Sequence, residues 1–147
     1  MGAMVHNWPA EEVDVVVVTD GSRILGLGDL GAHGMGIPIG KLMLYAAAGG
    51  IDPRRMMPAM LDAGTDNAAL RADPWYLGLS QPRLRGDEYF SLVHEFVNAV
   101  HHRWPKAIIQ FEDFSSDKAG KILDTYRANH LCFNDDIQGA RGGGCCG

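Results

Sequence analysis

A nearly continuous apolar run, VDVVVV at Val13–Val18, is the feature that most limits how this chain can fold. A strand with one wet face alternates apolar and polar residues. This run does not alternate, so it predicts a strand that is covered on both faces. The Asp20-Gly21 pair that follows is a hairpin signal, and it predicts that Ser22–Leu25 returns as a second strand.

The last third of the chain alternates strands and helices. The segments KAIIQFEDF and LCFNDD read as apolar strands that each end in two acids, and the helix SSDKAGKILDTYRAN lies between them, with Ser115 or Ser116 as its cap. A strand–helix–strand unit of this length joins parallel neighbours. Helical patterns at 37–50 and 87–104 and a short strand around Ala59–Leu61 complete the chain. We therefore expect an α/β fold, a parallel-sheet core with flanking helices plus the N-terminal β-hairpin.

Size and composition narrow the possible classes of protein. The 147 residues correspond to one domain, and the net charge of -5 argues against a nucleic-acid partner. No apolar stretch approaches the roughly 18 residues of a membrane span, and the first residues do not form a secretory signal. We expect an intracellular protein, with cytoplasmic and mitochondrial locations not distinguished. Residues 1–139 are predicted to form the folded domain, and 140–147 an irregular glycine-rich tail.

Acids stand where the two C-terminal strands end. Glu112 and Asp113 close one strand, and Asp135 and Asp136 close the other. Sites in open α/β sheets gather at the carboxyl ends of strands, so these carboxylates are expected to crowd one edge. Like charges this close repel unless a cation or a shared proton relieves them, and oxygen ligands favour Mg²⁺ or Mn²⁺. The alternative is that single acids serve as helix caps or solvated loop residues.

Two cations are candidates for contact with a substrate. Arg23 offers a planar fork for a carboxylate, and its alternative is an ordinary surface cation. Lys41 lies near the start of the helix predicted at 37–50. Partial burial, a nearby metal and the positive helix end would lower the pKa of Lys41, as a general base requires. From pattern alone, an ordinary helix lysine is the commoner case.

The segment GLGDLG at Gly26–Gly31 fits G-x-G-x-x-G but not its usual context. A dinucleotide-binding fingerprint follows a buried strand directly and opens a helix, whereas here a hairpin precedes the glycines and the helix begins near Pro38. Asp29 would also bring a negative charge towards a pyrophosphate. The loop therefore favours a tight crossing from hairpin to helix, flanked by Arg23 and Lys41. A nucleotide site built on this loop is the weakest alternative.

Several blocks, in this order, closely resemble the malic enzymes: VVVVTDGSRILGLGDLGAHGMGIPIGKLMLYAAAGGI, LDAGTDN, DPWYLGL, RLRGDEY, IIQFEDF and FNDDIQG. They run from about Asn7 to Gly139 and cover part of the malate-binding domain of that family. The resemblance implies oxidative decarboxylation of L-malate to pyruvate and CO₂, with reduction of NAD or NADP and a requirement for Mg²⁺ or Mn²⁺. It also implies homo-oligomers for full-length members.

The resemblance assigns a role to each candidate residue. Lys41 looks like the base that takes the malate hydroxyl proton, and Asp135 looks like its supporting partner. Arg23 looks like the malate carboxylate clamp, and Arg23 and Asp136 are implied to adjoin the cofactor. Three acids look like the metal ligands: Glu112, Asp113 and Asp136.

Some features of the family are expected outside this sequence. The catalytic tyrosine belongs upstream and the nucleotide-binding domain downstream, so we expect the 147 residues to be inactive alone. Ala140 stands where the family has threonine, and the tail with Cys145 and Cys146 looks foreign to it. The alternative is a non-catalytic remnant that binds a divalent metal or a dicarboxylate, or that docks on a full-length relative.

Overall fold

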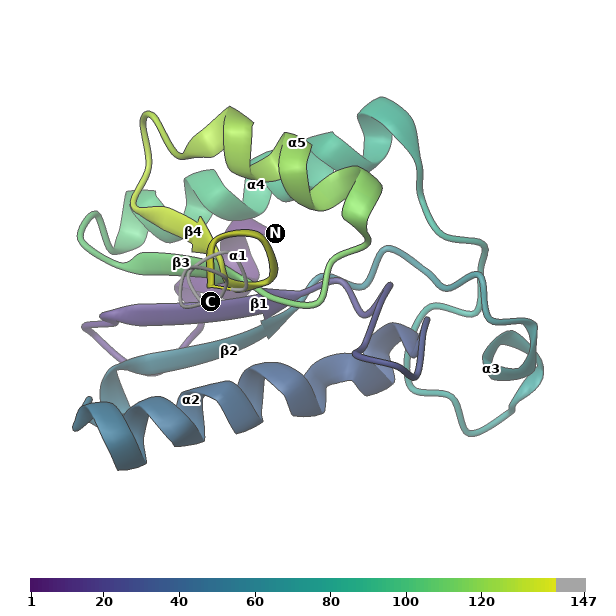
Figure 1. Cartoon of the computed structure of the whole chain (residues 1–147), viewed down its shortest axis with the longest axis horizontal. Helices are drawn as coiled ribbons and strands as arrows, with labels where there is room; N and C mark the ends of the chain where they lie inside the picture. Colours follow the sequence, from purple (N-terminus) through teal and green to yellow (C-terminus); the bar gives the residue numbers. More distant parts are fainter. Residues whose placement is uncertain (140–147) are drawn as a thin grey trace, which may run out of the picture.

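Four parallel strands form the centre of the computed structural model, which describes residues 1–139 (Figure 1). Their spatial order is β2-β1-β3-β4, and each neighbouring pair is parallel. The α/β class and the parallel core with flanking helices are confirmed, whereas the predicted tail at 140–147 lies outside the described residues. The strands are β1 (Val15–Thr19), β2 (Met56–Met60), β3 (Ile108–Phe111) and β4 (Cys132–Asn134).

Helices cover both faces of this sheet, with α2 on one side and α4 and α5 on the other (Figure 1). The three long helices lie within a few residues of their predicted ranges. No helix in the described part of the chain has both the length and the apolar character needed to cross a bilayer. The α-helices among residues 1–139 are α1 (Gly2–His6), α2 (Gly36–Gly49), α3 (Ala68–Ala72), α4 (Gly86–Arg103) and α5 (Ser116–Tyr126).

The valine run behaves as its lack of alternation predicts. Val16 and Val18 pack into the core beneath α4 and α5, whereas Val15 and Val17 pack against α2. All five residues of β1 are buried. A strand whose two faces are both covered needs apolar side chains at every position, which explains the continuous run.

The predicted N-terminal hairpin is wrong. Both neighbours of β1 are the parallel strands β2 and β3, so neither edge of β1 is free for a returning strand. Ser22–Leu25 instead leaves the sheet, and its Ile24 forms an isolated antiparallel bridge with Gly28. The Asp20 side chain is buried and accepts hydrogen bonds from the backbone and hydroxyl of Ser22. The Asp-Gly pair therefore ends the strand rather than reversing it.

Candidate metal centre

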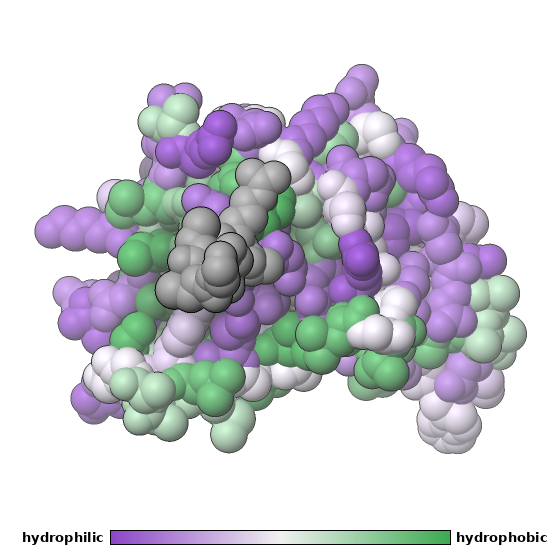
Figure 2. Space-filling model, viewed as in Figure 1, coloured by the Kyte–Doolittle hydropathy of each residue, from purple (hydrophilic) through white to green (hydrophobic). Residues whose placement is uncertain are grey.

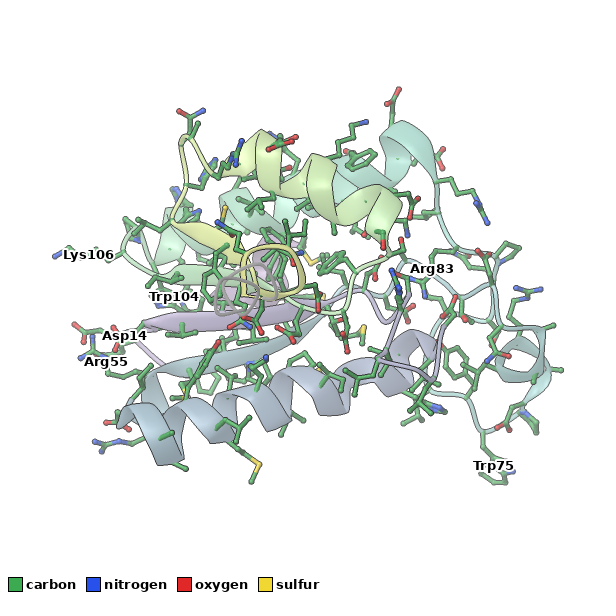
Figure 3. All side chains as sticks on the ribbon, viewed as in Figure 1. Asp14, Arg55, Trp75, Arg83, Trp104 and Lys106 are labelled. Atoms are coloured by element: carbon green, nitrogen blue, oxygen red, sulfur yellow. The ribbon has the colours of Figure 1, made fainter. Side chains whose placement is uncertain are left out.

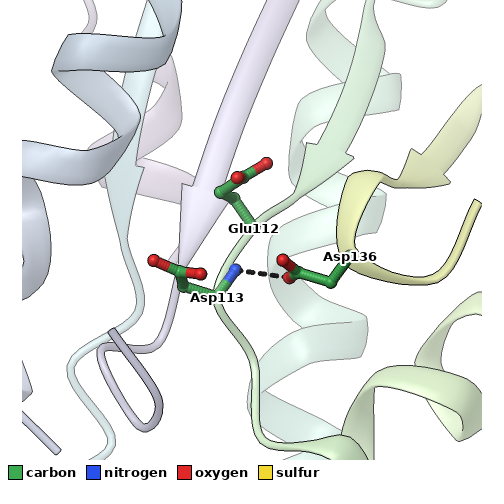
Figure 4. Close-up of side chains that lie close together, drawn as sticks. All are labelled: Glu112, Asp113 and Asp136. Carbon is green, nitrogen blue, oxygen red and sulfur yellow. Dashed lines mark hydrogen bonds between the residues drawn. The ribbon is translucent and has the colours of Figure 1, made fainter. Parts of the chain in front are cut away.

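The pairing of β3 with β4 brings the strand-end acids together. Phe111 pairs with Asn134, so the residues that follow each strand leave the sheet at the same edge. One carboxylate oxygen from each of three acids lies within 4.8 Å of the other two (Figure 4). These acids are Glu112, Asp113 and Asp136. Asp135, the fourth predicted acid, points to Lys41 instead.

The backbone around Asp113 is shaped for this arrangement. Asp113 adopts a positive φ of 54°, which is uncommon for a residue other than glycine. Its backbone N–H donates to Asp136 Oδ2 at 2.8 Å, which ties the ends of β3 and β4 together (Figure 4). Asp113 Oδ2 is buried and has no hydrogen-bond partner among the described residues. A buried carboxylate oxygen without a donor is costly, and a cation is the partner that would satisfy it.

Burial makes the anionic form of these acids unfavourable. Glu112 and Asp113 are each 5% exposed, and burial raises the pKa of both carboxyl groups. The charge of Asp136 raises the pKa of Asp113 further. A divalent cation would offset both effects. A set made only of carboxylate oxygens fits the hard ions Mg²⁺ and Mn²⁺.

Lys41 reaches the same edge from α2. Its Nζ lies 2.7 Å from Asp135 Oδ2 and 3.0 Å from Glu112 Oε1. Burial disfavours the charged ammonium, but the hydrogen bonds from Lys41 to Asp135 and Glu112 outweigh it and raise the pKa of Lys41. The lowering expected from burial is therefore outweighed in this structure, because two carboxylates lie against the ammonium.

Arg23 lies beside a pocket of about 340 Å³ that two of the acids also line. Asp113 and Asp136 form one side of this pocket, and Ser116 lines it together with Arg23. The guanidinium donates to the Ser116 hydroxyl at the start of α5. The pocket thus combines carboxylates that fit a cation with a fork that fits a carboxylate.

The glycine-rich loop is held by internal contacts. Its acid, Asp29, accepts hydrogen bonds from Thr65 and from Arg83, whose Nη2 lies 2.6 Å away. A Cβ on Gly21 would meet the carbonyl oxygen of Gly31 at 2.0 Å, so the chain can pass this closely only because residue 21 has no side chain. The geometry favours the predicted tight crossing of the chain.

Sequence reasoning missed a buried pair of hydrogen bonds that links Glu112 to α2. Gln110 lies in β3, is fully buried, and donates from Nε2 to Glu112 Oε2 at 2.5 Å. Its Oε1 accepts from the Tyr45 hydroxyl on α2. The only signal in the sequence is a single amide inside the apolar run KAIIQF.

The sequence of this chain closely matches those of known proteins. The sequence profile described as "Malic enzyme, N-terminal domain" matches residues 1–127. The mitochondrial NAD-dependent malic enzyme 59 kDa isoform of Solanum tuberosum is 62% identical over 142 residues, which cover 97% of this chain and 24% of that protein. The NADP-dependent malic enzyme of Dictyostelium discoideum is 56% identical over 137 residues, covering 93% of this chain and 25% of that protein. The chain thus spans about a quarter of the length of these curated relatives, and it belongs to the malic enzyme family.

Proposed function

We propose that this chain carries the metal-binding and malate-binding edge of a malic enzyme, which converts L-malate to pyruvate and CO₂ and reduces NAD or NADP. One observation carries the proposal: three carboxylates from two neighbouring strands converge, and one of their buried oxygens lacks a donor. Glu112, Asp113 and Asp136 would hold Mg²⁺ or Mn²⁺. The ion would polarise the hydroxyl and adjacent carboxylate of a hydroxy-acid and stabilise the charge left when CO₂ departs.

The remaining side chains have roles that follow from their positions. Arg23 lines the pocket beside Asp113 and Asp136, so it is placed to bind a substrate carboxylate and orient it towards the acids. Arg23 and Asp136 are also the residues proposed to lie next to the nicotinamide cofactor.

Lys41 is proposed as the base that takes the hydroxyl proton of malate. Its ammonium must first lose a proton, and the nearest acceptors are Asp135 and Glu112. The Asp135 side chain is 37% exposed, so it connects Lys41 Nζ with solvent. Asp135 is therefore proposed to support Lys41 by passing its proton outwards.

The 147-residue chain is expected not to oxidise malate by itself, because it spans about a quarter of each relative. Its relatives include both NAD- and NADP-dependent enzymes by name, so either cofactor fits the proposal. The mitochondrial names of the plant relatives support an organellar location.

Calorimetric titration of the chain with Mn²⁺ tests the metal site. We expect one Mn²⁺ site in the parent chain and loss of most of its affinity in Asp136→Asn. Even residues that only contact the metal ligands usually contribute 10-fold or more to metal affinity. Asp124→Asn is the matched control, because Asp124 is a surface acid paired with Arg127. Absence of binding in the parent chain, or equal binding in Asp136→Asn, would contradict the assignment.

A metal-binding or dicarboxylate-binding chain without turnover is the second candidate, and the converging acids with the adjoining Arg23 pocket fit it as well. Malate-dependent reduction of NAD or NADP tests whether the chain turns over malate by itself. A rate that requires Mn²⁺ and disappears in Lys41→Ala would establish catalysis by the chain alone and overturn the expected inactivity. Mn²⁺ binding without any rate would agree with both proposals for the isolated chain.

A further inference from the structure

Gln110 is a fully buried amide whose place in the fold calls for an explanation. It pairs with Val17 in the sheet and therefore faces α2, whereas Ile109 and Phe111 on either side face the α4–α5 layer. Burying an amide costs free energy unless both of its polar atoms are paired. Both are paired here, because Nε2 donates to Glu112 and Oε1 accepts from Tyr45, each at 2.5 Å.

The chemistry of the two partners fixes which amide atom of Gln110 faces Glu112 and which faces Tyr45. An ionised carboxylate can only accept, so the amide must present its Nε2–H to Glu112 and its Oε1 to the Tyr45 hydroxyl. The other oxygen of Glu112 lies 3.0 Å from Lys41 Nζ. Lys41 and Tyr45 are four residues apart on α2, so a single helix face supports both oxygens of Glu112, directly and through Gln110.

We propose that Gln110, with Tyr45 behind it, is a positioning residue that holds the Glu112 carboxylate in the orientation that binds the divalent cation. The inference rests on the proposed function. Glu112 has three rotatable bonds, and Gln110, two residues before it in the last part of β3, reaches its carboxylate. A donor fixed inside the sheet therefore limits the carboxylate to one orientation before the cation arrives. Partners of this kind usually contribute 10- to 100-fold to metal affinity.

The test is a Mn²⁺ titration by calorimetry of the 147-residue chain and three variants. Gln110→Met keeps the approximate size and removes the donor, and we expect about a 10-fold loss of Mn²⁺ affinity. Tyr45→Phe removes the hydroxyl that orients the amide, and we expect a smaller loss of a few-fold. The double variant should bind no more weakly than Gln110→Met, because Tyr45 acts only through Gln110.

Tyr126→Phe is the matched control. Tyr126 lies in α5, on the opposite face of the sheet, and its hydroxyl is 3.3 Å from a ring nitrogen of His94. This variant also loses one hydroxyl that contacts another side chain, and its Mn²⁺ affinity should equal that of the parent. Thermal unfolding in the presence of a chelator reports the cost of each variant to folding separately from metal affinity.

The outcomes distinguish this inference from the proposed function. Parental Mn²⁺ affinity in Gln110→Met overturns the inference alone, even if the variant is less stable, because Gln110 then only packs. Additive losses in the double variant overturn the role of Tyr45. A parent chain that binds no Mn²⁺ overturns the metal site and this inference with it. If Gln110→Met does not fold, the same assay is applied to Tyr45→Phe, which changes a half-buried helix position. A few-fold loss of Mn²⁺ affinity then supports the inference, and parental affinity overturns it.

Discussion

Asp113 carries a buried carboxylate that is expected to cost stability while no cation is bound. Its carboxylate is buried, one oxygen lacks a partner, and its pKa is raised by burial and by Asp136. Asn has no charge to bury and tolerates a positive φ better than most residues. We therefore expect Asp113→Asn to stabilise the metal-free chain by about 1 kcal/mol and to abolish most Mn²⁺ binding. Urea unfolding with a chelator, beside a Mn²⁺ titration, measures both. A less stable variant would contradict this account of Asp113.

The raised pKa values of Glu112 and Asp113 also predict how binding depends on pH. A raised pKa means that the folded state binds these protons more tightly than the unfolded state does. The stability of the metal-free chain therefore falls as pH rises through that pKa. Mn²⁺ requires the ionised carboxylates and must displace these protons. Affinity should therefore keep rising with pH above the range in which ordinary carboxyl groups titrate, and calorimetry in two buffers of different ionisation enthalpy should detect proton release on binding. Constant affinity with no proton release would show that these acids titrate normally.

How much of the candidate site the sequence predicts depends on the residue. Glu112 and Asp136 could be placed at one edge because each ends an apolar strand and neighbouring parallel strands end together. The raised pKa of Lys41 could not be foreseen, since it depends on how far the carboxylates of Glu112 and Asp135 reach towards α2. Gln110 was missed because a lone amide in an apolar run does not reveal which face of the strand it occupies.

Helices and strands could be predicted where local sequence determines them, but not where contacts with distant segments do. The continuous valines of β1 and the apolar spacing of α4 are local signals, and both elements form as predicted. The hairpin after β1 was wrong because Asp-Gly reverses a strand only when a free edge is available for pairing. In this fold β2 and β3, which come much later in the chain, take both edges of β1. Local turn chemistry was thus overridden by strand order.

The end of β1 is tied to both helices of the α4–α5 layer. Asp20 is fully buried and accepts from the Tyr89 hydroxyl at 2.6 Å and from Lys118 Nζ at 3.2 Å. Arg83, labelled in Figure 3, lies at the same place and donates to the Asp20 backbone carbonyl. These contacts join α4, α5 and the loop before α4 to the strand that precedes Arg23.

Asp20→Asn is expected to lower the free energy of unfolding by about 3 kcal/mol, because it leaves the ammonium of Lys118 buried without its carboxylate. Asp124→Asn, at a solvent-exposed pair, should change stability by less than about 0.5 kcal/mol. Urea unfolding compares the two. Mn²⁺ affinity below the unfolding transition should stay within a few-fold of the parent, since Asp20 is not among the converging acids. Equal stability of the two variants would show that this network contributes little.

At the scale of the whole molecule, the two faces of the sheet are covered unequally. The core cluster beneath α4 and α5 is much larger than the one beneath α2. The apolar side of α2 is only partly covered, because Leu42 is buried but Met43 is 67% exposed and Ile39 is 44% exposed. Hydrophobic side chains gather along the α2 side of the molecule (Figure 2). Together with Met56 and Pro58 of the edge strand β2, these residues line an apolar pocket of about 510 Å³.

An exposed apolar surface of this kind promotes association, because burying it stabilises the associated form by about 25 cal/mol for each Å² of apolar area. We expect the chain to self-associate as its concentration rises and Met43→Gln to weaken that association several-fold. Met4→Gln is the matched control, since Met4 is 74% exposed, slightly more than Met43, but lies on α1, away from the α2 pocket. Sedimentation velocity over a concentration series measures the effect. A parent chain that stays monomeric at high concentration, or equal weakening by both variants, would show that the α2 side does not drive association.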